Sequence, residues 1–123
     1  MPRYTVTLVD EVTLVEFEGI VMTRRFWWLG VVDGLLLQGR RDFVVSLHGA
    51  RLRTFADTRF VGAVAERILG SGGRVAFVPP PGRRASARVH SVARTHHALA
   101  APSVESAVAA ISVNRNSPGS SEL

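Results

Sequence analysis

The stretch that decides the fold is "FADTRFVGAVAERILGSGGRVAFV", residues 55–78. Its apolar residues recur at i, i+1, i+4, i+5, i+8 and i+9, which predicts a helix over Thr58–Leu69 with one wide buried face. These residues are Phe60, Val61, Val64, Ala65, Ile68 and Leu69. "GSGG" then supplies the glycines that end a helix, and "RVAFV" is a short apolar run typical of a strand covered on both faces. A helix that leads directly into a buried strand indicates an α/β domain.

Strands and helices also alternate on the N-terminal side of this stretch. "YTVTLV" and "VTLVEFE" alternate polar and apolar residues around Asp10-Glu11, which predicts a hairpin. Thr23 is positioned to cap a helix with an apolar stripe, and "DFVVSLH" is typical of a central strand. The stripe consists of Trp27, Trp28, Val31, Val32, Leu35 and Leu36. The order up to residue 78 is therefore ββαβαβ.

The C-terminal third continues the alternation. "PPPG" breaks the chain, and "RRASARVHSVAR" has the spacing of a helix with Ala85, Val89 and Val92 facing inward. "THHALA" predicts a short edge strand, and Ser103 caps a last helix. We therefore predict one α/β domain over residues 1–112 and a disordered tail over 113–123. Its mostly parallel central sheet has four or five strands, an N-terminal hairpin and about four helices.

Composition limits the classes of function. The 123 residues suffice for one core, and without cysteine neither disulfides nor thiolate metal sites can form. The net charge of +5 comes from dispersed arginines, without lysine and without a single basic stripe, so we expect no nucleic-acid partner. No apolar run approaches the roughly 20 residues that span a bilayer, and the N-terminus lacks the pattern of a signal peptide. We expect a cytoplasmic protein without membrane insertion.

The chain offers few combinations of histidine, acidic and nucleophilic residues that could catalyse a reaction. We therefore expect no enzyme and no cofactor or metal. The histidines are His48, His90, His96 and His97, and no aspartate or glutamate lies between residues 67 and 104. On a strand, the adjacent pair His96-His97 would send its rings to opposite faces. No nucleophile, base and orienting group stand at a suggestive spacing. A response-regulator receiver needs a lysine, which this chain lacks.

The triplet Asp57-Thr58-Arg59 stands at the start of the predicted helix over Thr58–Leu69. Asp57 as N-cap would accept hydrogen bonds from the first backbone N–H groups, and Thr58 would point outward from the first turn. Helix capping alone explains these residues. The alternative is a phosphorylation switch, because a phosphate on Thr58 would lie at a positive helix end while changing the surface charge by nearly two units.

The order of elements and the segment "LHGARLRTFADTRFVGAVAERILGSGGRVAFV" resemble a STAS domain, the fold of anti-sigma factor antagonists and stressosome scaffold proteins. The resemblance covers about residues 4–112. The positions that match the antagonist helix are Asp57, Thr58, Val61, Gly62 and Val64. Two positions depart from it: Arg59 replaces the serine that antagonists usually phosphorylate, and Phe60 replaces the first glycine. In stressosome proteins the phosphoacceptor directly follows the aspartate, as Thr58 does here.

The resemblance implies a non-catalytic module that regulates bacterial transcription or stress signalling by switching partners. Thr58 would accept a phosphate from a serine/threonine kinase of the anti-sigma type, while Asp57, Arg59, Arg53 and Gly62 would contact that kinase or another STAS protein. The resemblance also allows a homo-oligomer of this chain, since a monomeric antagonist and a subunit of a large scaffold share this fold. Two alternatives stay open: a STAS subunit that docks on a membrane transport complex, and a degenerate STAS domain that is never phosphorylated.

Overall fold

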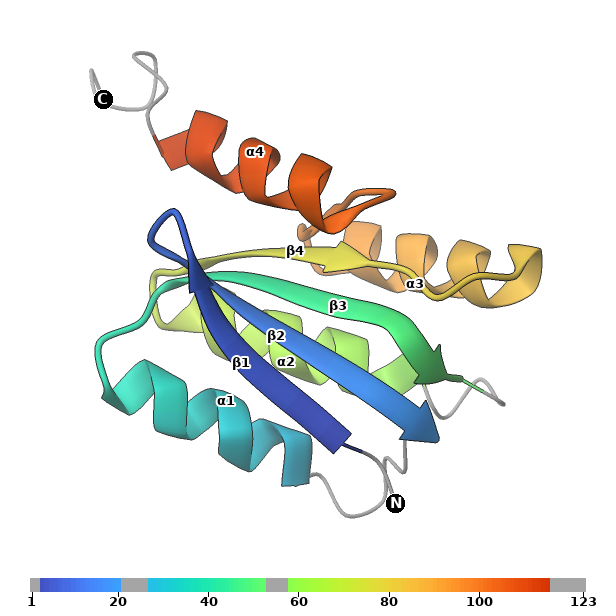
Figure 1. Ribbon diagram of the computed structural model, residues 1–123, viewed down its shortest axis with the longest axis horizontal. Helices are drawn as coiled ribbons and strands as arrows, with labels where there is room; N and C mark the ends of the chain where they lie inside the picture. Colours follow the sequence, from blue (N-terminus) through green and yellow to red (C-terminus); the bar gives the residue numbers. More distant parts are fainter. Residues whose placement is uncertain (1–2, 21–26, 53–57, 116–123) are drawn as a thin grey trace.

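The computed structural model describes residues 3–20, 27–52 and 58–115 and shows a five-stranded sheet with helices on both faces (Figure 1). The elements in chain order are β1 (Arg3–Val9), β2 (Val12–Ile20), α1 (Trp27–Leu37), β3 (Asp42–Arg51), α2 (Arg59–Gly70), β4 (Arg74–Val78), α3 (Arg83–Thr95), β5 (Leu99–Ala100) and α4 (Val104–Arg115). Strands follow one another across the sheet in chain order. Only the β1–β2 pair is antiparallel, and the pairs from β2 to β5 are parallel. The predicted fold class is confirmed.

The helices divide into two layers. In Figure 1, α1 and α2 lie on one face of the sheet and α4 lies on the other. The larger core includes Phe43, Val45 and Leu47 of β3 and is closed by α1, α2 and α3. The smaller core joins Val44 of the same strand to α4. Consecutive side chains of β3 are therefore buried on opposite faces, which explains its uninterrupted apolar sequence.

The N-terminal hairpin turns in two residues. Val9 pairs with Val12, so Asp10 and Glu11 alone form the turn, with φ of 49° and 68°. Both lie in the left-handed region, which a two-residue turn of the mirror-image type requires. The predicted hairpin is confirmed, although neither turn residue is glycine.

The connection from α2 to β4 is a tight glycine turn. Gly72 has a φ of +87°, and its N–H donates to the carbonyl of Leu69 while that of Gly73 donates to the carbonyl of Ile68. These two hydrogen bonds satisfy carbonyl groups that would otherwise lack a partner at the helix end. The turn confirms that "GSGG" ends the helix, and β4 begins directly after it.

The C-terminal part confirms the predicted edge strand but places the two histidines outside it. His96 and His97 lie at the end of α3 and not on a strand, and His97 has a φ of 60°. The backbone N–H of Ala98 bonds the carbonyl of Ala93, which closes this helix end as the glycines close α2. The short edge strand predicted within "THHALA" is confirmed as β5, Leu99–Ala100. Ser103 caps α4 as expected, since its Oγ accepts the N–H of Ser106 at 3.1 Å.

The last helix also extends past the predicted domain end. Because α4 reaches Arg115, residues 113–115 are helical and do not belong to a tail. The remainder of the predicted tail, residues 116–123, lies outside the described residues, as does Thr23. Within the described ranges, no helix has both the length and the apolar character needed to cross a membrane.

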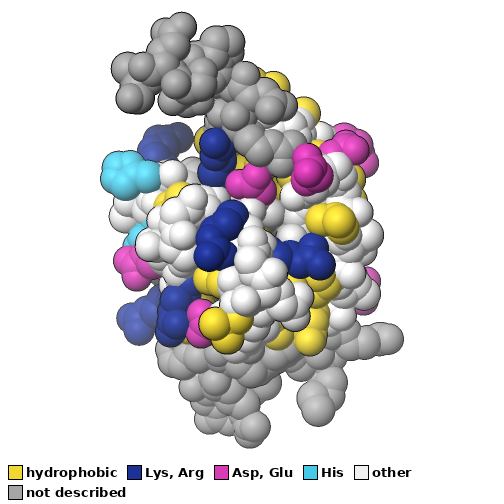
Figure 2. All heavy atoms as spheres, turned by 90° about the vertical axis from the view of Figure 1, so that its left-hand side faces the viewer, with side chains coloured by type: hydrophobic (Ala, Val, Ile, Leu, Met, Phe, Trp, Pro, Cys, Tyr) yellow, Lys and Arg dark blue, Asp and Glu magenta, His cyan; other side chains and the backbone are white. Residues whose placement is uncertain are grey.

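Figure 2 shows the end of the molecule with the β1–β2 turn, where basic side chains alternate with acidic and apolar ones.

Candidate functional site

The first turn of α2 places Thr58 inside the protein. The residue is only 1% exposed, so the expectation that it points outward is wrong. It occupies the N-cap position with helical backbone angles, φ −82° and ψ −10°, where Asp57 was expected. Burial follows from the helix itself, because Phe60 and Val61 anchor the same turn in the core. Asp57 and Arg53 lie outside the described residues.

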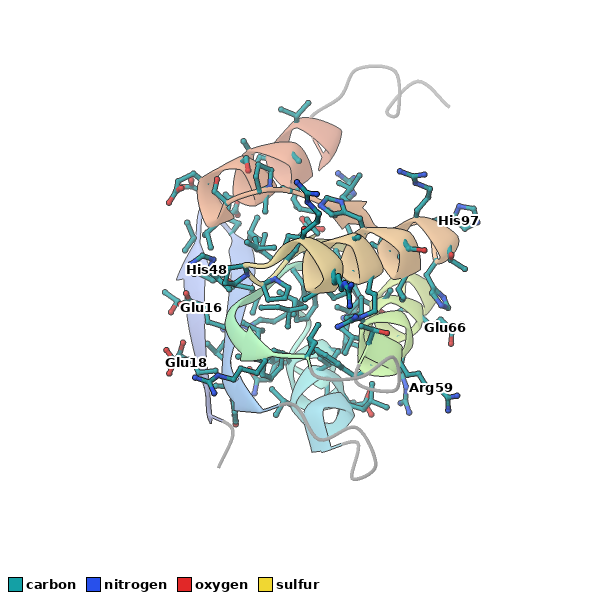
Figure 3. The ribbon with its side chains drawn as sticks, turned by 90° about the vertical axis from the view of Figure 1, so that its right-hand side faces the viewer. Glu16, Glu18, His48, Arg59, Glu66 and His97 are labelled. Atoms are coloured by element: carbon teal, nitrogen blue, oxygen red, sulfur yellow. The ribbon has the colours of Figure 1, made fainter. Side chains whose placement is uncertain are left out.

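Arg59 is the exposed member of this turn. Its side chain projects from α2 on the same side of the molecule as Glu66, while Glu16 and Glu18 lie across the sheet on β2 (Figure 3). Arg59 therefore presents a positive charge at the surface.

A groove of about 460 Å³ runs along α2 and is closed on its other side by α3. Its lining residues are Thr58, Arg59, Gly62, Ala63, Glu66, Val92 and His96. Thr58, Gly62 and Glu66 stand four residues apart and form one row along the helix. The groove thus extends from Thr58 at the start of α2 to a surface that carries both charge signs.

His96 crosses this groove from the end of α3. Its Nδ1 lies 3.2 Å from Oε2 of Glu66, with side-chain exposures of 29% and 69%. A Cβ added at Gly62 would lie 2.6 Å from Nε2 of His96, so the ring rests directly on the glycine. Gly62 therefore has a local function, because only a residue without a side chain leaves room for this imidazole.

Arg88 fixes the neighbouring end of β3. Its Nη2 donates to the carbonyl of Leu52 at 3.0 Å, which ties α3 to the residue that follows β3. The Nε of Arg88 is buried and has no hydrogen-bond partner among the described residues. Arg88 thus connects α3 to the end of β3.

Phe60 explains one of the two departures from the antagonist pattern. The ring is fully buried and meets Phe17 of β2 edge-on, with centroids 6.2 Å apart. The aromatic ring of Phe60 thus fills the core under the first turn of α2. The departure thus serves packing between helix and sheet.

We predict that Gly62→Ala displaces His96 without unfolding the protein. The new methyl group overlaps the imidazole, which is the movable end of a partly exposed side chain, so the ring must leave the groove and release Glu66. Alanine gains about 1 kcal/mol of helix propensity, which offsets this loss. The expected change in unfolding free energy is below about 1 kcal/mol, together with large NMR shifts of the His96 ring signals. Unchanged ring signals would contradict the contact, and Gly70→Ala, with nothing within 4 Å, is the control.

Sequence reasoning missed His96 and Glu66 as site residues. They are 30 positions apart in the chain, and only the packing of α3 beside α2 brings them together. The available signal was Gly62, a glycine in the middle of a strongly periodic helix, which usually marks a close approach. Among the described residues, no three histidine, aspartate or glutamate side chains gather in a way that could hold a metal ion.

The comparison with known proteins starts from structure, because no family model matches the chain and no curated protein resembles it significantly in sequence. An anti-sigma factor antagonist from Mycobacterium paratuberculosis superposes with a TM-score of 0.69 at 16% identity, covering 90% of this chain and 94% of that one. TM1081 from Thermotoga maritima gives 0.67 at 18%, covering 88% and 93%. The antagonist SpoIIAA in its unphosphorylated form gives 0.61 at 11%, covering 93% and 99%. With its antiparallel hairpin, parallel sheet and four helices, this chain has the STAS fold of the anti-sigma factor antagonists.

Proposed function

We propose that the chain is a non-catalytic STAS module that binds a regulatory partner through the start of α2 and the adjoining groove. The observation that carries the proposal is this groove, which joins Thr58, Arg59 and Gly62 on one surface within the fold of the antagonists. The residues there offer hydrogen bonding and charges of both signs. Binding and release of a protein are the functions that such a surface suits.

In this proposal Thr58 is the phosphoacceptor, and a serine/threonine kinase of the anti-sigma type is the partner. Because Thr58 is 1% exposed, the kinase must first open the beginning of α2 to reach the hydroxyl. Local opening of a helix end costs far less than global unfolding. The phosphate would then add close to two negative charges beside Arg59 and reverse the charge that a partner meets.

A second candidate is a STAS domain that binds its partner without modification. Two observations favour it: Thr58 is buried, and the exposed position next to it is arginine, which cannot accept the phosphate. Such a domain would dock constitutively, either on another STAS protein or on a membrane transport complex. The two candidates differ in one observable, which is reversible phosphate on Thr58.

Affinity capture from host lysate with the wild type, Thr58→Ala and Thr58→Glu tests the proposal. We expect a kinase-fold protein to be held by the wild type and Thr58→Ala, and to bind Thr58→Glu at least tenfold more weakly, because the carboxylate places negative charge in the groove. Mass spectrometry identifies the captured protein and measures phosphate on Thr58. Circular dichroism must show that Thr58→Glu is folded.

Thr7→Glu is the matched control, since Thr7 is exposed on the edge strand β1, away from the groove. It should bind like the wild type. If all baits capture the same transport components, the docking candidate replaces the switch. If Thr58→Glu and Thr7→Glu hold the kinase equally, Thr58 has no part in partner choice.

A further inference from the structure

We propose that His96 receives the phosphate on Thr58, so that the groove between α2 and α3 is the binding site of the modified side chain. This inference rests on the proposed function, and it names the residue that reads the modification. A phosphate on a buried threonine needs a cationic donor close by, because an unpaired buried dianion would destabilise the fold. His96 is placed to be that donor.

The geometry follows from the helical row that starts at Thr58. Thr58 and Gly62 are four residues apart, so their Cβ positions are separated by about 5–6 Å on the same face of α2. Nε2 of His96 lies 2.6 Å from the Cβ position of Gly62. The imidazole therefore lies about one helical turn from the threonine, in the groove that both residues line. A phosphate extends a hydroxyl far enough to bridge much of that distance.

The two ring nitrogens of His96 have different surroundings. Nδ1 faces Oε2 of Glu66 at 3.2 Å, and Nε2 faces the floor of the groove over Gly62. A protonated imidazole has two N–H donors, so it can keep the Glu66 contact while it donates from Nε2 to a phosphate oxygen. Because the His96 side chain is only 29% exposed, this charged bond would be weakened less by solvent than one at an open surface.

The other charged residues of the groove also favour binding of the phosphate there. Arg59 is exposed at its entrance and adds a second cation beside the phosphate. Glu66 is the opposing charge, but it is two turns from Thr58 and its side chain is 69% exposed, so it can turn toward water. The backbone of His96 is fixed, because its N–H bonds the carbonyl of Val92 at 3.1 Å. The ring is therefore presented from a rigid helix end.

The test installs phosphothreonine at position 58 during synthesis and measures the melting temperature with and without the phosphate. In the wild type we expect a small change on phosphorylation. In His96→Gln we expect the phosphate to lower the melting temperature by at least about 4 °C more than in the wild type. His96→Arg should restore most of the difference, because a guanidinium also binds phosphate.

His90→Gln is the matched control, as the same substitution at an exposed position of α3 that does not line this groove. It should leave the phosphate effect as in the wild type. Equal phosphate effects in the wild type, His96→Gln and His90→Gln would overturn the proposal. Since the phosphate is installed without a kinase, this result is independent of whether any kinase modifies Thr58, which the capture experiment decides.

Discussion

Phe60→Ala is expected to lower the free energy of unfolding by about 3–5 kcal/mol, the range for removal of a fully buried aromatic ring. Phe60 is 0% exposed and packs edge-on against Phe17 at 6.2 Å, so its loss leaves a cavity between α2 and the sheet. The cavity cannot collapse easily, because β2 is paired on both sides and α2 is held by β4 and α3. Denaturant unfolding followed by circular dichroism measures the change.

The control for Phe60→Ala is Val113→Ala, which removes apolar atoms from a residue of α4 that is 66% exposed. Its expected effect is within about 0.5 kcal/mol. Phe60→Gly, which introduces the residue of the antagonist pattern, should be at least as destabilising as Phe60→Ala, since glycine also lowers helix propensity. A loss below about 1 kcal/mol in Phe60→Ala would mean that the ring is not a core residue here.

The fold was predictable because local signals and periodicity agree along most of the chain. The apolar row of the Phe60–Leu69 segment and the glycines after it predicted α2 and its end, and both are confirmed. The uninterrupted apolar run of β3 predicted a strand buried on two faces, which the two cores confirm. The inward packing of Trp27 and Trp28 stays a prediction, because their side chains lie outside the described part of the structure.

The candidate site was predictable only in part, for a physical reason. The sequence indicated the start of α2, but the direction of Thr58 depends on how far the helix rotates when Phe60 and Val61 enter the core. A helix that includes Thr58 places it seven residues, or nearly two turns, before the buried Ala65, and so on the same face of α2. The Asp57 cap prediction placed Thr58 outside, whereas the structure has Thr58 itself at the N-cap position and buried.

The groove could not be predicted from the sequence. Its second wall comes from α3, and His96 reaches Gly62 only because α3 ends where it does. The prediction of a strand around His96-His97 assigned these rings to opposite faces of a sheet. In the structure His97 adopts a φ of 60° instead, which ends the helix and leaves His96 facing α2. A histidine with left-handed backbone angles is uncommon, so no local sequence signal predicted that α3 would end at His97.

Gly73→Ala is the second substitution with a large expected effect, a loss of about 3 kcal/mol in the free energy of unfolding. A Cβ at Gly73 would overlap the carbonyl oxygen of Arg41 and would also come within 3.0 Å of the Ile68 side chain. That carbonyl cannot retreat without loss, because it accepts the N–H of Arg74 at 2.9 Å where β3 and β4 begin to pair. Thermal and denaturant unfolding should both show the loss.

Gly70→Ala separates this steric effect from the general effect of replacing a glycine. Gly70 ends α2, has nothing within 4 Å of its Cβ position and has no positive φ, so alanine there should be neutral or stabilising by about 0.5–1 kcal/mol. The two substitutions are three residues apart in the same turn and add the same methyl group. Equal stabilities of the two variants would show that the chain does not pass against Arg41. A loss confined to Gly73→Ala would establish that the close approach to the carbonyl of Arg41, where β3 and β4 begin to pair, requires a residue without a side chain.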